Sequence, residues 1–366
     1  MTSLNASRFL RAWCRVVPVL AMLVWVGQAA ASTLNQNVSW TIDRPGTTTK
    51  YRIVAYGDSI YAGYNGSISN AARFAAPTVD AEYLSAQWNA DIESVRRAKS
   101  GAVAKDVYEN KIVAERSYMQ SSNTRVVTFE MCGNDGLQAR SALKAQTGTC
   151  DYGVLSTAEA NCKTYVAAAM DYINANAYAG VKLKVISNLY YPGYAADNVQ
   201  SRCRDPGTGA TVNLQDKFLL SLARINYWMC EYARLKGFQC ADSFADYMGA
   251  DYDRNGDGLV DSEALRYMPG ESESNYVTRI TSTLRSTIRD SNAHLISATS
   301  SYDYIQSDDV HPTYTGGTVT AGLFGGSTGS GAPRYSTISG GKNPIWNQYG
   351  HERMGWRLST SNPMAP

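Results

Sequence analysis

Three short segments of the 366-residue chain carry side chains that could together turn a hydroxyl into a nucleophile. Ser59 follows a Gly-Asp pair at the end of an apolar run, so its hydroxyl can stand at the start of a helix, where free N–H groups favour negative charge. In the segment 308–312, Asp308 precedes His311 by three residues and can hold one imidazole nitrogen, which leaves the other nitrogen as a base. These residue types indicate attack by a serine on a carbonyl group.

The third segment, Gly133-Asn134-Asp135, adds a side-chain amide that can donate a hydrogen bond to an oxyanion. Each segment also has a simpler interpretation, because Gly-Asp-Ser and Gly-Asn-Asp are ordinary turn compositions. The chain has three histidines. We interpret His294 as a local hydrogen-bonding residue, and the spacing to Asp308 makes His311 the candidate base.

Apolar, β-branched runs and helix-like stretches alternate along the chain and must position these side chains. Such alternation predicts an α/β fold, a three-layer α/β/α sandwich with a central, mostly parallel sheet, in which ligands lie beyond the carboxyl ends of the strands. The segments that carry Ser59 and Asn134 each follow a predicted strand. The predicted strands are 51–56, 92–95, 125–131, 181–189 and 238–243, and the predicted helices include 158–177, 214–235 and 275–291.

The segments resemble the sequence blocks of the GDSL or SGNH hydrolases, in the same order and over nearly the whole mature length. The first block is similar to residues 57–60, with Ile60 in place of the usual leucine, and it implies Ser59 as nucleophile. The block after the second strand is best matched by Gly101, which implies a backbone N–H donor. The remaining blocks imply Asn134 as a side-chain donor, and Asp308 and His311 as orienting carboxylate and general base. Family members place a final helix soon after the catalytic histidine, so the resemblance also implies that His351 lies at the start of that helix.

The resemblance therefore implies the flavodoxin-like SGNH hydrolase fold and a serine esterase or lipase that forms an acyl-enzyme. Ser59, Gly101 and Asn134 would form the oxyanion hole, and catalysis would need no cofactor. The substrate would be an ester of a lipid or of an acylated carbohydrate. The family also includes carbohydrate O-acetyl esterases, phospholipases and acyltransferases. A non-catalytic, calcium-dependent surface-binding protein on the same scaffold is the alternative from another class.

The N-terminus has the pattern of a secretory signal peptide. Three arginines precede the apolar run 16–26, and a stretch of small residues ending at Ala31 supplies a cleavage site. An uncleaved membrane anchor is the alternative, but eleven apolar residues are too few for a stable spanning helix. The sequence thus predicts removal of residues 1–31 and a single domain, 32–366, that is extracellular or periplasmic, monomeric and without a stable membrane anchor.

Charge and cysteine content narrow the classes further. Removing residues 1–31 takes away three arginines and no acidic residue, so 31 basic residues face 32 acidic ones and the net charge changes from +2 to −1. A nearly neutral chain gives no electrostatic reason to bind nucleic acid. Loss of Cys14 leaves six cysteines, an even number that favours up to three disulfides in an exported protein. The short loops favour the pairs Cys150–Cys162 and Cys230–Cys240.

A separate insertion, residues 251–264, resembles a calcium-binding loop of the EF-hand type. Oxygen ligands at loop positions 1, 3 and 5, a glycine at position 6 and an apolar residue at position 8 fit that pattern, but Ala264 stands where the bidentate glutamate belongs. A solvated turn is the alternative. The predicted ligands of a structural calcium ion are Asp253, Asn255, Asp257, Leu259 through its carbonyl, Asp261 and Glu263.

Two further segments leave their roles open. The Gly/Ser/Thr-rich stretch 315–341 is interpreted either as a mobile loop near the site or as a plain surface insertion. The aromatic segment 190–194 follows the fourth predicted strand and could line the site or pack in the core.

Overall fold

The computed structural model describes residues 35–191, 197–248, 265–286, 304–322, 326–334 and 349–361. The predicted signal peptide, the calcium-loop residues 253–263 and His294 lie outside these ranges and stay predictions. No helix within the ranges is long and apolar enough to cross a membrane.

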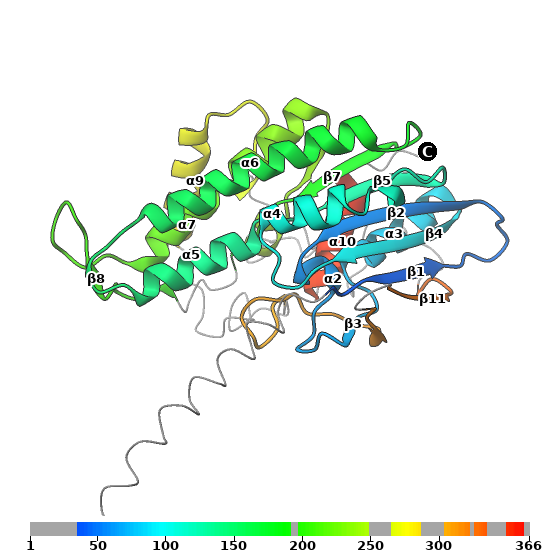
Figure 1. Cartoon of the computed structure of the whole chain (residues 1–366), viewed down its shortest axis with the longest axis horizontal. Helices are drawn as coiled ribbons and strands as arrows, with labels where there is room; N and C mark the ends of the chain where they lie inside the picture. The colour runs from blue at the N-terminus through cyan, green and yellow to red at the C-terminus, as the bar shows by residue number, and fades with distance from the viewer. Residues whose placement is uncertain are drawn as a thin grey trace, which may run out of the picture.

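The centre of the molecule is a mostly parallel sheet, as predicted, with the order β11-β1-β4-β2-β5-β7-β9 (Figure 1). The strands β4, β2, β5, β7 and β9 are all parallel, and β1 is antiparallel to β4. In chain order these five strands run second, first, third, fourth, fifth, which is the flavodoxin-like order. The bounds are β1 Val38–Ile42, β2 Lys50–Gly57, β4 Asp91–Ala98, β5 Thr124–Phe129, β7 Leu183–Ser187, β9 Gln239–Ala241 and β11 Ser327–Gly331.

Helices cover both faces of the sheet, which confirms the three-layer α/β/α class. One face packs against α3 (Ala76–Trp88) and α10 (Gly350–Ser361), and the other against α6 (Gly153–Asn176) and α7 (Leu214–Lys236), which lie side by side in Figure 1. The other helices are α2 Ser59–Ala62, α4 Ala104–Asp106, η1 Val107–Val113, η2 Arg116–Tyr118, α5 Gly133–Ala145, α8 Ser243–Met248 and α9 Glu273–Ser286.

The central strands form where the sequence predicts them because both of their faces are buried. Residues 53–57 of β2 are buried without interruption, and a strand covered on both faces reads as a continuous apolar run. The predicted strands and helices differ from the observed ones mainly at their ends.

The outer strands β1 and β11 carry no such run. The strand β11 comes from the Gly-rich stretch 315–341, and β10 (Thr318–Thr320) from the same stretch pairs with β3 (Asn70–Ala72). A Cβ on Gly329 would lie 2.4 Å from the Trp40 ring of β1, so the glycine allows the ring to lie against the strand. In its described parts the stretch therefore adds an edge strand to the central sheet and a second strand that pairs with β3.

One of the two predicted disulfides is confirmed and the other is wrong. Cys230 pairs with Cys240, whereas Cys150 pairs with Cys203. Cys150 is held near Cys203 because β6 (Gly148–Thr149) pairs with β8 (Cys203–Arg204). Cys162 lies within α6, buried in the core beside the thiol of Cys132, and both are free.

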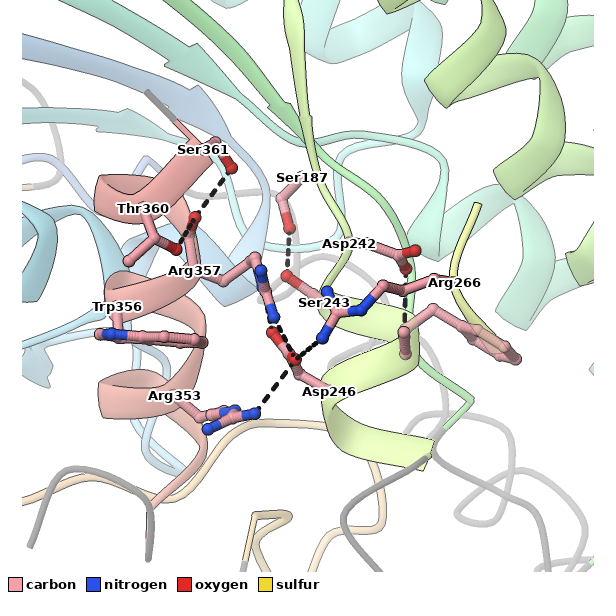
Figure 2. Close-up of polar contacts among 12 residues, drawn as sticks. Ser187, Asp242, Ser243, Asp246, Arg266, Arg353, Trp356, Arg357, Thr360 and Ser361 are labelled. Atoms are coloured by element: carbon pink, nitrogen blue, oxygen red, sulfur yellow. Dashed lines mark hydrogen bonds and ion pairs between the residues drawn. The ribbon is translucent and has the colours of Figure 1, made fainter. Parts of the chain in front are cut away.

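A buried carboxylate fastens the last helix to the rest of the molecule (Figure 2). Asp246 of α8 is fully buried and accepts hydrogen bonds from Arg353 and Arg357 of α10, at 3.1 and 2.5 Å, while Arg266 lies 3.9 Å away. Burial raises the pKa of Asp246, but Arg353 and Arg357 outweigh burial and hold the pKa at about 2. The carboxylate is therefore charged under all ordinary conditions.

We expect Asp246→Asn to lower the free energy of unfolding by about 3 kcal/mol at pH 7, because it leaves the buried Arg353 beside a neutral group. Urea unfolding measures this loss. The wild type should lose the same contribution as the pH falls from about 4 to about 2, since the folded-state pKa lies below the unfolded value.

The control is Glu109→Gln, which removes a carboxylate from the exposed pair with Lys105 and should cost no more than about 0.5 kcal/mol. Equal losses in the two variants would contradict a fastening role for Asp246.

Candidate active site

Ser59, His311 and Asp308 form a continuous hydrogen-bonded chain. His311 Nε2 lies 2.8 Å from Ser59 Oγ, and His311 Nδ1 lies 2.6 Å from Asp308 Oδ2. With Nδ1–H donated to the carboxylate, Nε2 is left with a lone pair toward the hydroxyl. The geometry is that of a serine with a base and a group that orients the base, although the residues are 252 positions apart in the chain.

Asp308 is held as a carboxylate by the segment it belongs to. Its Oδ1 accepts the backbone N–H groups of Val310 and His311, at 3.0 and 2.9 Å. Burial raises the pKa of Asp308, but the hydrogen bonds from the His311 ring and backbone outweigh burial and keep the pKa below its usual value. The neighbouring Asp309 adopts a left-handed backbone conformation, φ 61°, and does not contact the imidazole through any recorded hydrogen bond in the described ranges.

The turn that presents Ser59 is fixed by Asp58. This aspartate is the N-cap of α2, and its Oδ1 accepts the N–H of Ile60 at 2.9 Å. Ser59 is the first residue of the helix, so its own N–H points outward with no intrahelical acceptor. Asp58 is buried, and its contacts hold the backbone of the turn.

Gly101 and Asn134 lie beside this turn, at the carboxyl ends of the strands that flank β2. Gly101 follows β4 with φ 77°, a left-handed conformation that favours glycine, and its N–H has no recorded acceptor among the described residues. Asn134 is the second residue of α5, after β5. Its Nδ2 donates to Asp58 Oδ2 at 2.9 Å and to the carbonyl of Ala102 at 3.0 Å.

The bonds of Asn134 to Asp58 and to the carbonyl of Ala102 place its amide near the Ser59 turn and near Gly101, the other two predicted oxyanion donors. Both of its amide hydrogens have acceptors in this structure, so donation to an oxyanion requires one of them to be shared or redirected. The adjoining Asp135 has a different task. Its Oδ2 accepts the N–H of Ala104 at 2.7 Å, and burial raises its pKa to about 6.

The segment that carries His311 is held in place by contacts that the sequence did not predict. The Tyr190 hydroxyl donates to the carbonyl of Val310 at 2.5 Å, and the Tyr190 ring stacks on Tyr247 with centroids 4.4 Å apart. Gln306 donates from Nε2 to the carbonyls of Tyr64 and Pro312. Tyr190 belongs to the aromatic segment noted above, but a contact with residue 310 has no signal in the local sequence.

A largely apolar cavity of about 80 Å³ opens beside these groups. Ile60, Gly133 and Val310, which adjoin Ser59, Asn134 and His311 in the chain, line it. Further lining residues, Phe218 and Leu222 among them, come from α7. The cavity therefore lies between the chain neighbours of Ser59, Asn134 and His311 and the helical layer.

The remaining histidine, His351, does not join the site. It is fully buried at the start of α10, and its Nδ1 accepts the N–H of Ala76 at 3.2 Å. Burial, together with the charges of Arg96 and His311, lowers its pKa to about 3, so the ring is neutral. Within the described ranges no three His, Cys, Asp or Glu side chains converge in a way that could hold a metal ion.

We expect Tyr190→Phe to lower kcat by about tenfold, because the Val310 carbonyl loses its donor and the imidazole is then less tightly positioned against Ser59. Ester hydrolysis by the purified variant measures the change. Tyr227→Phe is the matched control, since it removes a hydroxyl that donates to the carbonyl of Glu271, away from the segment that carries His311. A Tyr227→Phe variant with the same loss of kcat would argue against a specific role for Tyr190.

No family model and no curated protein matches the sequence. The structure is similar to that of a lipase from a goat rumen metagenome, with 16% identity, a TM-score of 0.41, and coverage of 64% of this chain and 96% of that one. It is also similar to phospholipase A1 from Streptomyces albidoflavus, with 16% identity, a TM-score of 0.41, and coverage of 55% of this chain and 82% of that one. A third similar structure is a variant of an acetyl xylan esterase from Geobacillus stearothermophilus, with 13% identity, a TM-score of 0.37, and coverage of 66% of this chain and 94% of that one. At these identities and TM-scores the likenesses assign neither a family nor an activity, so the functional argument rests on the side chains themselves.

Proposed function

We propose that this protein is a secreted serine hydrolase of carboxylic esters, of the GDSL or SGNH type. The observation that carries the proposal is the hydrogen-bonded chain Ser59–His311–Asp308 at the carboxyl ends of the strands. In open α/β sheets this edge is where ligands bind, and the flavodoxin-like order has its switch point between β2 and β5, the strands that precede Ser59 and Asn134.

The proposed reaction proceeds through an acyl-enzyme. His311 Nε2 takes the hydroxyl proton as Ser59 Oγ attacks the ester carbonyl carbon, and the N–H groups of Ser59 and Gly101 with the Asn134 amide stabilise the oxyanion. The imidazolium then protonates the leaving alkoxide, and the alcohol departs. Water attacks the acyl-enzyme with His311 again as base, and the acid is released. The charged Asp308 stabilises the imidazolium in both steps.

The cavity supports an apolar acyl chain as the group that Ser59 carries. Its wall is built largely from aliphatic and aromatic side chains, which stabilise an alkyl chain by removing it from water. This favours a lipase or esterase over a carbohydrate O-acetyl esterase, because the acetyl group has only a methyl group to place in the cavity. A phospholipase or acyltransferase uses the same acyl-enzyme and differs only in the alcohol or the acceptor.

The alternative from another class, a non-catalytic calcium-dependent surface-binding protein, requires that the site be vestigial. A vestigial site has no physical need to keep Ser59 and His311 at 2.8 Å with Asp308 oriented behind them. Covalent labelling by a fluorophosphonate at Ser59 separates the two functions, because only an activated serine reacts.

We expect Ser59→Ala and His311→Ala each to lower kcat by at least about 10⁴-fold on p-nitrophenyl esters while the fold is kept. Circular dichroism and the melting temperature check the fold. Ser141→Ala, on the exposed side of α5, serves as the control and should keep full turnover. Turnover within tenfold of wild type by either of the first two variants would contradict the mechanism.

We expect Leu222→Trp to shift the preference toward short acyl chains, because the larger ring occupies cavity volume on the α7 side. In a series of p-nitrophenyl esters from acetate to palmitate, kcat/KM should fall about tenfold or more for the long chains and change little for acetate. Leu220→Trp is the control, since Leu220 is equally part-buried on α7 but does not line the cavity. An unchanged chain-length profile for Leu222→Trp would remove the assignment of the cavity to the acyl chain.

The predicted calcium site at residues 253–263 would have a structural role, because the proposed hydrolysis uses no metal. We expect the melting temperature of the purified protein to fall by several degrees when EGTA replaces calcium, and Asp253→Ala with Asp257→Ala to abolish that response. Isothermal titration that detects no calcium binding, with a melting temperature unmoved by EGTA, would remove the prediction.

A further inference from the structure

A second buried carboxyl group, Glu130, lies against the turn that presents Ser59, and the reaction described above does not use it. Glu130 directly follows β5, is 2% exposed, and its backbone N–H donates to the carbonyl of Tyr56. Its Oε1 accepts the N–H of Asp58 at 2.6 Å. A Cβ on Gly57 would lie 2.5 Å from the same oxygen, so the glycine of the motif is what lets Glu130 reach the turn.

The contact continues from Glu130 to the oxyanion donor. Asp58 accepts the N–H of Ile60 on one carboxylate oxygen and the Asn134 amide on the other. Since Asp58 Oδ2 fixes one of the two Nδ2 hydrogens of Asn134, whatever fixes Asp58 also sets the direction of that amide. A Cβ on Gly133 would lie 3.2 Å from Asp58 Oδ2, so little free space remains on that side.

Two carboxyl groups in contact inside the protein cannot both be charged without a large cost, so one of them holds a proton. Burial raises the pKa of Asp58 too, but the N–H of Ile60, the Asn134 amide and the nearby His311 oppose that rise, so Asp58 is the partner that keeps the charge. Burial first, and then the negative charge of Asp58, raise the pKa of Glu130 well above its usual value. The backbone N–H groups of Asp58 and Tyr61 oppose this rise without cancelling it. Oε1 accepts the Asp58 N–H, and Oε2 has no hydrogen-bond partner among the described residues, so Oε2 is the atom that can hold the proton.

We propose that Glu130 is a positioning residue that acts as a neutral carboxylic acid: it accepts the Asp58 N–H, donates its own proton to the Asp58 carboxylate, and through Asp58 sets the Ser59 turn and the Asn134 amide. The proposal rests on the proposed function, because Ser59 and Asn134 are taken to be nucleophile and oxyanion donor. It adds a residue to which neither role is assigned: Glu130 lines the cavity described above, but it is not one of the groups taken to react with the ester carbonyl.

The test compares Glu130→Ala, Glu130→Gln and wild type in steady-state hydrolysis of a p-nitrophenyl ester. Glu130→Ala should lower kcat by about 10- to 100-fold, because a misdirected oxyanion donor weakens transition-state binding. Glutamine has the shape of a neutral glutamic acid, with an oxygen to accept the Asp58 N–H and an amide to donate to the carboxylate. Glu130→Gln should therefore restore kcat to within about threefold of wild type.

Asp80→Ala is the matched control. Asp80 is another carboxyl group, 2% exposed and with its pKa raised by burial, but it lies on α3 and contacts neither Asp58 nor Asn134 through a recorded hydrogen bond in the described ranges. Its removal should lower the melting temperature about as much as that of Glu130 and leave kcat within about threefold. Equal loss of kcat in Asp80→Ala and Glu130→Ala would reduce Glu130 to a general stability role and overturn the proposal.

The outcomes also separate this proposal from the proposed function. A wild type that neither hydrolyses esters nor reacts with a fluorophosphonate contradicts the hydrolase itself. An active wild type whose kcat is unaffected by Glu130→Ala contradicts only the role of Glu130. A Glu130→Gln variant as impaired as Glu130→Ala would mean that an ionised carboxylate is required, which overturns the neutral acid.

Discussion

The hydrogen bond between Ser59 Oγ and His311 Nε2, 2.8 Å long, is the constraint on which the rest of the site depends. Ser59 is fixed by the parallel sheet, but His311 reaches it on a segment that belongs to no helix or central strand. That segment is clasped by α10, whose first two residues donate N–H groups to Thr313, two positions after the histidine. The carboxylate of Asp246 binds α10 to α8 and thereby helps to hold the segment that places His311 against Ser59.

The surroundings of Ser59 contain buried carboxyl groups and a strained backbone conformation, both of which cost free energy, whereas the segment that carries His311 is more exposed. Asp58 and Glu130 are buried carboxyl groups in contact, and Cys132, the N-cap of α5, has φ 82°, a left-handed conformation that is strained for a side chain of its size. Strain and buried polar groups of this kind persist only where the surroundings determine the geometry fully. Here the surroundings are the strands β2 and β5, whose carboxyl-terminal halves are buried without interruption.

What the sequence could predict follows from how local each feature is. The strands β2 and β5 read as apolar runs because both faces are buried, and Ser59, Asn134 and His311 stand out because their chemistry is carried by adjacent residues. The contact of Tyr190 with Val310, the partner of Cys150 and the strand β11 have no local signal. Each depends on residues brought together by the fold, and β11 is an edge strand of small residues with no apolar pattern.

Two carboxyl groups near the reaction centre are held in opposite states, and their positions explain why. Asp308 keeps its charge because its partners are N–H groups of His311 and because its side chain is 37% exposed, so in the proposed reaction this charge would stabilise the imidazolium formed when Ser59 is deprotonated. A second uncompensated negative charge on the oxyanion side would oppose the tetrahedral intermediate. A proton on Glu130 removes that second charge, and Glu130 still accepts the N–H of Asp58 in the Ser59 turn. The charge that remains on Asp58 is stabilised by hydrogen bonds from the Ile60 N–H and the Asn134 amide. The electrostatics of the site thus favour negative charge behind the base and limit it behind the nucleophile.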